Sequence, residues 1–140
     1  MATACFPTSP VSEWVKDANG DGVISEAEVD AQRQVIVAQV LAAVAASRRE
    51  VQLHPVLACI RHHESDRGAY PYTNGYAAKN SRSTASGAYQ FINGTWRNVS
   101  ASAGFPGYST ARQAPWYVQD AVALWVINHQ GRSAWNGSGC

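Results

Sequence analysis

Apolar residues in the first third of the chain recur at the spacing of one helix face. They are Val29, Ile36, Val37, Val40, Leu41 and Val44. Ser25 and Glu28 precede this run with the spacing of a capping box, which marks the N-terminus of a helix. Upstream, Ser9 and Pro10 favour the start of a shorter helix, because proline is tolerated in a first turn. The pattern therefore predicts two helices that flank the polar segment 17–28.

A further helical pattern begins at Pro55 and ends at Glu64. Leu57, Ile60 and Glu64 fall on one face of this helix, so a carboxylate lies at the end of an apolar stripe. Partial burial of a carboxyl group raises its pKa and keeps it protonated near neutral pH. Glu64 is therefore a candidate general acid, although a solvated glutamate at a helix end would look the same in the sequence.

The segment that follows combines turn residues with aromatic side chains. Residues 70–76 include Pro, Asn and Gly between tyrosines, which predicts an aromatic loop. Residues 83–91 predict a small β-hairpin that ends in Tyr89, Gln90 and Phe91. Together these patterns predict an α+β fold that is mostly helical. Amide groups and aromatic faces are what a neutral, N-acetylated sugar chain requires of its binding groove.

The charges divide the chain into an acidic and a basic part. The length of 140 residues suits one core with a small appendage, which we place at residues 51–140 and 9–50 respectively. Residues 1–50 hold seven acids and four bases, whereas residues 51–140 hold three acids and seven bases. The bases are dispersed, so we expect no nucleic-acid partner and favour an anionic polymer such as a bacterial cell wall.

Targeting signals are missing from the sequence. Residues 1–15 lack the charged start and the apolar run of a signal peptide. The most apolar stretch, residues 35–46, is shorter than a membrane span and contains Gln39. We therefore expect a monomer that does not insert into membranes. It is either made in a cytosol and released by another route, or secreted with its leader lacking from the sequence.

Residues 17–28 match the whole loop of an EF-hand, which is the strongest motif in the chain. The expected calcium ligands are Asp17, Asn19, Asp21, the carbonyl of Val23, and Glu28. Gly22 allows the sharp turn that such a loop needs. Glu28 is also placed to cap the following helix, and we favour chelation over capping. The alternative is a surface turn that binds no ion.

Acids are scarce beyond residue 50, which limits the choice of catalytic group. Glu64, Asp66 and Asp120 are the only carboxylates from residue 51 to residue 140. Asp66 is too close in sequence to face Glu64 easily across a sugar, and Asp120 lies in a predicted helix where a structural role is expected. A mechanism with a single carboxylate, Glu64, therefore fits the composition best.

Several short motifs, taken in their order along the chain, resemble those of lysozyme-like peptidoglycan glycosidases. The motifs are Glu64-Ser65, then Ser86-Gly87-Ala88-Tyr89-Gln90-Phe91, then Thr95-Trp96. The resemblance is to soluble lytic transglycosylases and to the resuscitation-promoting-factor domain, and it covers residues 52–140. It implies a lysozyme-like fold that cleaves the β-1,4 bond between N-acetylmuramic acid and N-acetylglucosamine, with Glu64 as general acid and base. It further implies that Ser65, Gln90, Tyr89 and Trp96 bind substrate or shape the groove.

The same resemblance bears on the end of the chain. The stretch from Ala114 to Ala121 is similar to the closing helix of these domains. In the resuscitation-promoting domains a cysteine just before the glutamate bonds a C-terminal cysteine, which favours a Cys59–Cys140 disulfide and leaves Cys5 free. The family uses either hydrolysis or transglycosylation, and the sequence leaves this choice open.

Other readings use the same residues differently. His62, His63 and Glu64 do not have the spacing of a zinc-protease helix, so we expect no zinc. A non-catalytic, calcium-dependent wall-binding module would keep the EF-hand and would not need Glu64. Together, the calcium loop and the missing leader favour a bacteriophage endolysin that lyses its host, and a secreted bacterial muralytic enzyme is the second choice.

Overall fold

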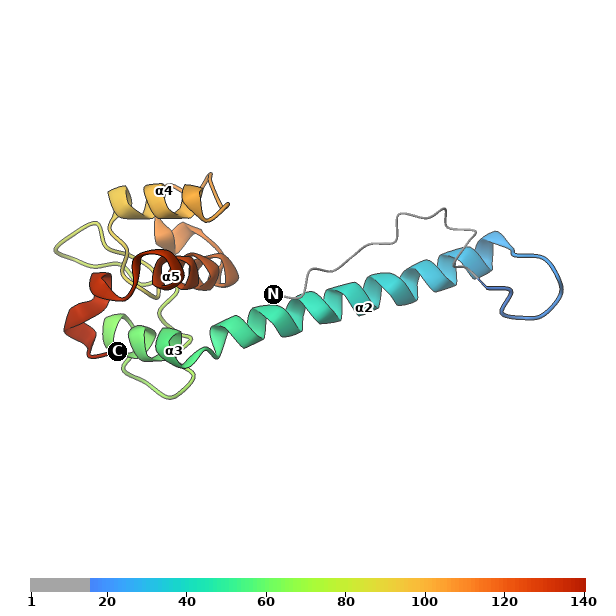
Figure 1. Cartoon of the computed structure of the whole chain (residues 1–140), viewed down its shortest axis with the longest axis horizontal. Coiled ribbons are helices and arrows are strands. Elements are labelled where there is room, and N and C mark those ends of the chain that lie inside the picture. Colours follow the sequence, from blue (N-terminus) through green and yellow to red (C-terminus); the bar gives the residue numbers. More distant parts are fainter. Residues whose placement is uncertain (1–15) are drawn as a thin grey trace. The chain divides into compact units, whose positions relative to one another are not determined.

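The computed structural model describes residues 16–140 and divides the chain into two compact units (Figure 1). The units are Met1–Arg48 and Arg49–Cys140, a division close to the one expected between residues 50 and 51. The predicted helix start at Ser9 and Pro10, and the cysteine Cys5, lie outside the described residues. Each unit is considered by itself below.

The described part of the first unit consists of a polar loop and most of the long helix α2, Glu26–Gln52. The predicted capping box is present, because Ser25 N donates to Glu28 Oε2 over 2.8 Å and Glu28 N donates to Ser25 Oγ over 3.2 Å. Two hydrogen bonds between Gln32 and the backbone of Lys16 tie the entry of the loop to the helix. The long helix expected from the apolar pattern is therefore confirmed.

Several apolar side chains of α2 are exposed. Val35 and Val37 are each 56% exposed and Leu41 is 64% exposed, and Gln52 is the only residue of α2 that is buried. By length and composition, α2 is the one described helix that could cross a membrane, contrary to the sequence expectation. Helices in protein cores and leader sequences meet the same criteria, so this finding assigns no location.

The second unit is mostly helical, as expected. Its helices are α3 (Pro55–Glu64), α4 (Asn93–Ser102), η1 (Ala111–Gln113), α5 (Trp116–Gln130) and η2 (Ser133–Ser138). Helix α5 packs against both α3 and α4, and η2 packs against α3 (Figure 1). The side chains at the centre of this packing are Leu57, Ile60, Trp96, Val118, Val122 and Val126, all at most 2% exposed. Helix α5 thus forms the middle of the unit and holds the other helices around it.

The predicted β-hairpin is not seen, and that prediction was wrong. Within the described residues the extended pairing is limited to two isolated bridges, Lys79 with Ser86 and Ser86 with Phe91. The chain reverses too soon for paired strands to form, because Gly87 and Gln90 both have positive φ angles, of 79° and 53°. Reciprocal backbone hydrogen bonds between Ser86 and Phe91, of 3.0 and 3.1 Å, close this tight turn.

A disulfide joins Cys59 of α3 to Cys140, as the resemblance led us to expect. The Cα atoms of the two cysteines are 5.9 Å apart. The bond fixes the C-terminal end of the chain to α3, against which η2 also packs. It closes a long loop, which restricts the unfolded chain and thereby favours the folded unit.

A charged network lies inside the second unit. Arg61 and Asp120 are both fully buried, with 3.6 Å between Arg61 Nη1 and Asp120 Oδ1. Tyr76 donates a hydrogen bond of 2.7 Å to the same carboxylate oxygen, and Tyr89 also donates to it. Arg61 further donates to the carbonyl of Gln52 and to two carbonyls of the aromatic loop. Asp120 therefore has a structural position, and burial raises its pKa.

Candidate functional site

Glu64 is the last residue of α3 and is partly exposed. Leu57 and Ile60, on the same face, are completely buried, so the carboxyl group lies where the core meets the surface. Burial raises the pKa of Glu64 above its ordinary value, and the charges of Arg67 and His63 oppose this shift. A carboxyl group in this position can hold a proton at a higher pH than a solvated one.

Ser65 fixes the end of α3 against the turn of residues 86–91. Its Oγ donates a hydrogen bond of 2.7 Å to the carbonyl of Ala88, and its backbone N–H donates to the carbonyl of Arg61. Gly75 packs so closely here that an added Cβ would lie 1.9 Å from Ser65 Oγ. The Ser65 hydroxyl is thus used inside the protein, which argues for a positioning role rather than the expected substrate contact.

Gln119 holds the other side of the same turn, and the sequence analysis gave it no role. It is 1% exposed, and its Oε1 accepts a hydrogen bond of 2.9 Å from the backbone N–H of Ala88. Its Nε2 donates to the carbonyls of Tyr76 and Ala114. A Cβ at Gly87 would lie 2.5 Å from Gln119 Oε1, so only glycine fits there. One buried amide therefore joins three segments around the turn.

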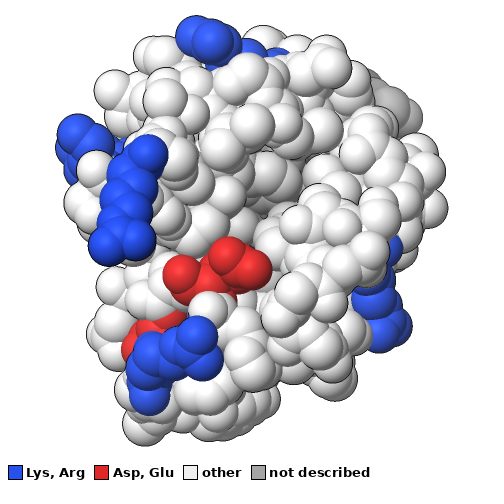
Figure 2. Space-filling model, turned by 90° about the vertical axis from the view of Figure 1, so that its left-hand side faces the viewer, with Lys and Arg blue, Asp and Glu red and all other residues white. Residues whose placement is uncertain are grey.

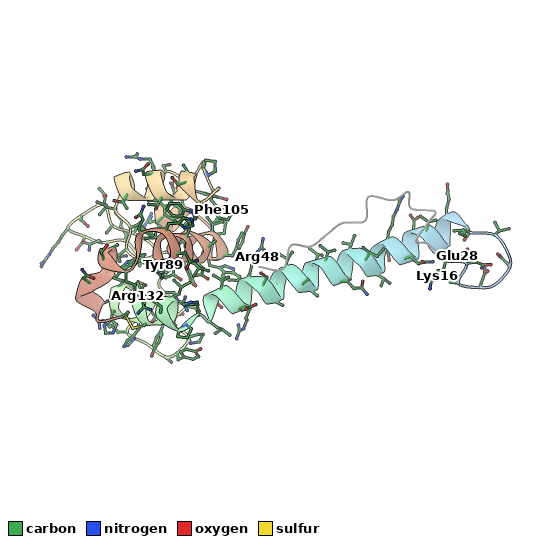
Figure 3. The ribbon with its side chains drawn as sticks, viewed as in Figure 1. Lys16, Glu28, Arg48, Tyr89, Phe105 and Arg132 are labelled. Carbon is green, nitrogen blue, oxygen red and sulfur yellow. A yellow bond between two sulfur atoms is a disulfide. The ribbon has the colours of Figure 1, made fainter. Side chains whose placement is uncertain are left out.

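The expected groove residues Tyr89 and Trp96 are core residues, which corrects the sequence interpretation. Tyr89 is 1% exposed and Trp96 is fully buried. Figure 3 shows Tyr89 among the helices of the second unit. The Tyr89 hydroxyl is engaged by Asp120 and Arg61, and Trp96 Nε1 donates to the carbonyl of Tyr108. Neither ring has a free face on which a sugar could stack, because large aromatic rings at these positions fill the core.

Gln90 keeps a partly exposed side chain within the turn. Its backbone has a positive φ of 53°, and its Nε2 donates a hydrogen bond of 3.0 Å to the carbonyl of Gly87. The turn therefore carries one amide near the surface, two residues beyond the Ala88 carbonyl that Ser65 contacts. This placement is compatible with the substrate contact expected for Gln90.

Asp66 organises the loop that follows α3. It is 6% exposed, and its two oxygens accept hydrogen bonds of 2.9 Å from the backbone N–H groups of Gly68 and Asn74. These bonds lower the pKa of Asp66, although burial opposes them. Asp66 is thus an ionised loop anchor. Together with the burial of Asp120, this leaves Glu64 as the one carboxyl group of residues 51–140 with a raised pKa and exposed surface.

The surface of the second unit is hollowed beside its acidic groups (Figure 2). In that view Lys and Arg side chains lie towards the margins, and neutral residues cover most of the hollow. A separate cavity of about 880 Å³ is lined by residues on either side of the turn, and Glu64 is not among them. The hollow, rather than this cavity, is the candidate groove for a neutral sugar.

The loop of the first unit folds around its own carboxylates. Asp17 accepts hydrogen bonds of 2.7 Å from Gly20 and Gly22, both of which have positive φ angles. Glu28 Oε1 accepts a bond of 3.0 Å from Ala18 N, so the end of the loop reaches back to its start (Figure 3). Backbone hydrogen bonds lower the pKa of both Asp17 and Glu28. Glu28 therefore caps α2 and also closes the loop by hydrogen bonds, and the expectation that it chelates calcium in preference to capping stays a prediction.

The oxygens of this loop suit calcium in kind and in order along the chain. The residues that would hold the ion are Asp17, Asn19, Asp21, the carbonyl of Val23, and Glu28. Asn19 and Asp21 are already linked by a hydrogen bond of 3.1 Å. Among the described residues, however, the one group with ligand atoms all within 4.8 Å of one another is Cys59, His63 and Cys140. The carboxylates would thus have to draw closer around an ion.

The Cys59, His63 and Cys140 group does not form a metal site in this structure. The two sulfurs are bonded to each other, so neither is a thiolate that could coordinate a metal. His63 lies one turn of α3 beyond Cys59 and is exposed. His62 Nδ1 lies 3.1 Å from the carbonyl of Asp66, which gives it a place in the loop structure instead.

Comparison of the chain with protein-family models, with curated proteins and with solved structures finds no match in any of the three. The functional argument therefore rests on the residues described above: the carboxyl group of Glu64, the turn that Ser65 and Gln119 hold, and the polar loop of the first unit.

Proposed function

We propose that this protein is a peptidoglycan glycosidase of the lysozyme-like kind, preceded by an EF-hand that binds calcium. In this proposal Glu64 cleaves the β-1,4 bond between N-acetylmuramic acid and N-acetylglucosamine. The observation that carries the proposal is the burial-raised pKa of Glu64 at the surface of the second unit. Asp66 and Asp120, the other carboxylates of residues 51–140, are both held by structural hydrogen bonds.

Glu64 acts first as an acid and then as a base. Its proton passes to the bridging oxygen as the glycosidic bond breaks, and the departing sugar leaves with a new hydroxyl group. The carboxylate that remains then takes a proton from water, or from the 6-hydroxyl of the muramic acid residue. Water gives hydrolysis, whereas the 6-hydroxyl gives an anhydro sugar. No second carboxylate is required by either route.

The turn of residues 86–91 supports this chemistry by position. Ser65 holds it to the end of α3, and Gln119 holds it from the other side. Gln90 then lies within the same rigid turn, with a side-chain amide suited to an acetamido group or a sugar hydroxyl. Fixed geometry of this kind is what a general acid needs in order to meet its substrate.

Replacement of Glu64 by Gln tests the proposal. The amide has the same shape but no proton to transfer, so clearing of a suspension of bacterial cell walls should slow by about 10²–10⁴-fold. Glu50→Gln, a change of the same kind at an exposed site on α2, should leave the rate unchanged. If the Glu64→Gln variant clears cell walls at an unaltered rate, the proposal that Glu64 catalyses cleavage is refuted. In the active protein, a released muropeptide lighter by one water identifies transglycosylation.

Calcium completes the proposal as a structural ion and takes no part in bond cleavage. It would neutralise the gathered carboxylates of Asp17, Asp21 and Glu28, which otherwise repel one another. Calcium is scarce in a cytosol and abundant outside, so a weak site would fill when the protein reaches the wall. This behaviour suits an endolysin that is made inside a bacterium and works on its wall.

A further inference from the structure

A cavity of about 880 Å³ in the second unit has a lining of one charge sign. Its lining residues are Lys79, Asn80, Ser81, Arg82, Ser83, Thr84, Ser86, Asn93, Thr110, Arg112 and Gln113. Three of these residues are cations, none is an acid, and the others are neutral and polar. A cavity with this lining attracts an anion, and it offers hydroxyl and amide groups for further hydrogen bonds.

The three cations have no carboxylate partner within residues 16–140. The ion pairs of this part of the chain are Arg33 with Asp30 and the buried Arg61 with Asp120. Lys79, Arg82 and Arg112 are exposed to water, and none of them is paired with an acidic side chain of this part of the chain. Their like charges repel one another, and an anionic ligand in the cavity would relieve this repulsion.

Asn93 adds a different requirement. Its Oδ1 is buried and has no hydrogen-bond donor within the described residues. A hydrogen-bond acceptor without a donor is costly when water is excluded, so a ligand N–H is favoured here. The cavity thus calls for a ligand that has both negative groups and N–H groups, which an amide-containing acid provides and a polyol phosphate does not.

We infer that this cavity binds the stem peptide of peptidoglycan, through the carboxylates and amides of its amino acids. The inference rests on the proposed function, because it names the part of the same substrate that lies beside the cleaved glycan. Ser86 links the two sites. It lines the cavity and opens the turn whose Ala88 carbonyl contacts Ser65, the neighbour of Glu64. A peptide branch of a glycan bound at Glu64 would have to follow this turn in order to reach the cavity.

Binding of the free stem tetrapeptide, with no sugar attached, tests the inference independently of catalysis. The full-length protein is titrated with L-Ala-γ-D-Glu-meso-diaminopimelate-D-Ala, and backbone amide shifts are followed by NMR. The expected shifts concentrate on residues 79–86 and on Arg112. The same peptide with its carboxylates amidated should bind at least about tenfold more weakly, because charge-assisted bonds are lost. Affinity should also fall as salt is raised.

The double change Arg82→Gln and Arg112→Gln should weaken binding of the tetrapeptide at least about tenfold. Both side chains are exposed, so the fold should persist, which circular dichroism can check. Arg97→Gln is the matched control, since Arg97 is an exposed arginine outside this cavity. If only the Arg82→Gln single variant folds, its affinity for the tetrapeptide should still fall by about threefold or more.

Four outcomes would overturn the inference, and the first three concern the tetrapeptide itself. They are the absence of tetrapeptide binding, binding that ignores amidation, and binding that the double variant retains. Stronger binding of poly(ribitol phosphate) than of the tetrapeptide would also overturn it, and would identify the anion as a phosphate polymer of the wall. Glu64→Gln separates this question from catalysis, because it should abolish wall clearing and leave tetrapeptide affinity unchanged. If the protein binds the tetrapeptide but does not cleave glycan, only the proposed glycosidase activity is refuted, and the inference about the cavity stands.

Discussion

Helices α2 and α5 are both rich in apolar residues, yet they meet opposite surroundings. In α5, Val122 is fully buried and Val126 is 2% exposed, whereas in α2 the side chains of Val37 and Leu41 are 56% and 64% exposed. The apolar content of a helix therefore leaves open what the helix packs against. Burial in the second unit depends on partners from α3 and α4 that the first unit does not supply within the described residues.

The interactions that stabilise the first unit also differ in kind from those that stabilise the second. The second unit has a packed core, a disulfide and a buried charged network. The described part of the first unit has exposed hydrogen bonds from its loop to its own carboxylates. Buried interactions resist opening far more than exposed ones do. We therefore expect the second unit to remain folded under conditions in which the loop of the first unit has already opened.

The largest effect is expected from Arg61→Leu, which removes the buried cation of the second unit. Asp120 would lose its ion-pair partner but keep the hydrogen bonds from Tyr76 and Tyr89. The Tyr89 hydroxyl and three backbone carbonyls would lose the donor that Arg61 provides. Breaking a buried ion pair in this way typically costs about 3–5 kcal/mol. Urea unfolding of the purified protein, followed by tryptophan fluorescence, measures the loss of free energy.

The double variant Arg61→Leu with Asp120→Leu provides the control. If most of the loss comes from the uncompensated charge of Asp120, removing both partners should recover part of the stability. No recovery would mean that the carbonyls left without Arg61 dominate the cost. A loss below about 1 kcal/mol in the single variant would contradict the contrast between the two units.

Much of the helical structure of both units could be predicted from the sequence, because spacing and capping signals are local. The capping box at Ser25 and the helix that begins at Pro55 are examples. The β-hairpin could not be excluded in the same way. Its replacement by a tight turn depends on the positive φ of Gln90, a residue type that gives no such signal. Gln119 and Ser65, which are distant in sequence, hold the turn by hydrogen bonds to the backbone of Ala88.

For the candidate site, too, the sequence showed local features but not contacts between residues that are distant in the chain. Glu64 could be found because acids are scarce and because it continues an apolar face. Tyr89 and Trp96 were misplaced, since an aromatic residue in a motif looks the same whether it faces a groove or fills the core. Arg61 shares the helix face of Leu57 and Glu64, so its burial could have been inferred from spacing alone. The role of Gln119 required the structure.

The next largest effect should come from calcium and should be confined to the first unit. At one hundred times its dissociation constant, an ion that binds only the folded loop adds about 2.7 kcal/mol. Amide hydrogen exchange should therefore slow in residues 17–28 and in the N-terminal part of α2 on addition of calcium. Exchange in α5 should not change.

Asp17→Asn is the matched control, because it removes one charge and keeps the size of the side chain. The calcium effect should largely disappear in this variant, while wall clearing in the absence of calcium stays the same. If amide hydrogen exchange in the unaltered protein is the same with and without calcium, residues 17–28 are a surface turn that binds no ion. The proposal of an EF-hand would then be refuted.

Acidification should affect the two regions in opposite directions. The pKa of Asp17 and that of Glu28 are lowered by backbone hydrogen bonds, so their stabilisation is present above the unfolded pKa and is lost as the pH falls through the folded value. The pKa of Glu64 is raised by burial, so its contribution is present at low pH and is lost as the pH rises through the folded value.

NMR titration of the side-chain carboxyl groups measures these pKa values directly. Wall clearing should decline on the alkaline side of the Glu64 titration, since the acid must hold its proton. The gain in stability on acidification at Glu64 should stay below about 1 kcal/mol, because the side chain is partly exposed. A Glu64 pKa at or below the ordinary value for glutamate would contradict its assignment as the general acid.

The smallest effect is expected from Leu41→Ala, and its comparison with Leu57→Ala is the sharpest test of the contrast between α2 and α5. Leu41→Ala removes an exposed side chain from α2, so the free energy of unfolding should change by less than about 0.5 kcal/mol. Leu57→Ala removes the same atoms from a fully buried site and should cost about 2–5 kcal/mol. A cost for Leu41→Ala approaching that of Leu57→Ala would show that the apolar face of α2 is covered in solution. Since alanine favours helix as strongly as leucine, such a loss could not be attributed to helix propensity.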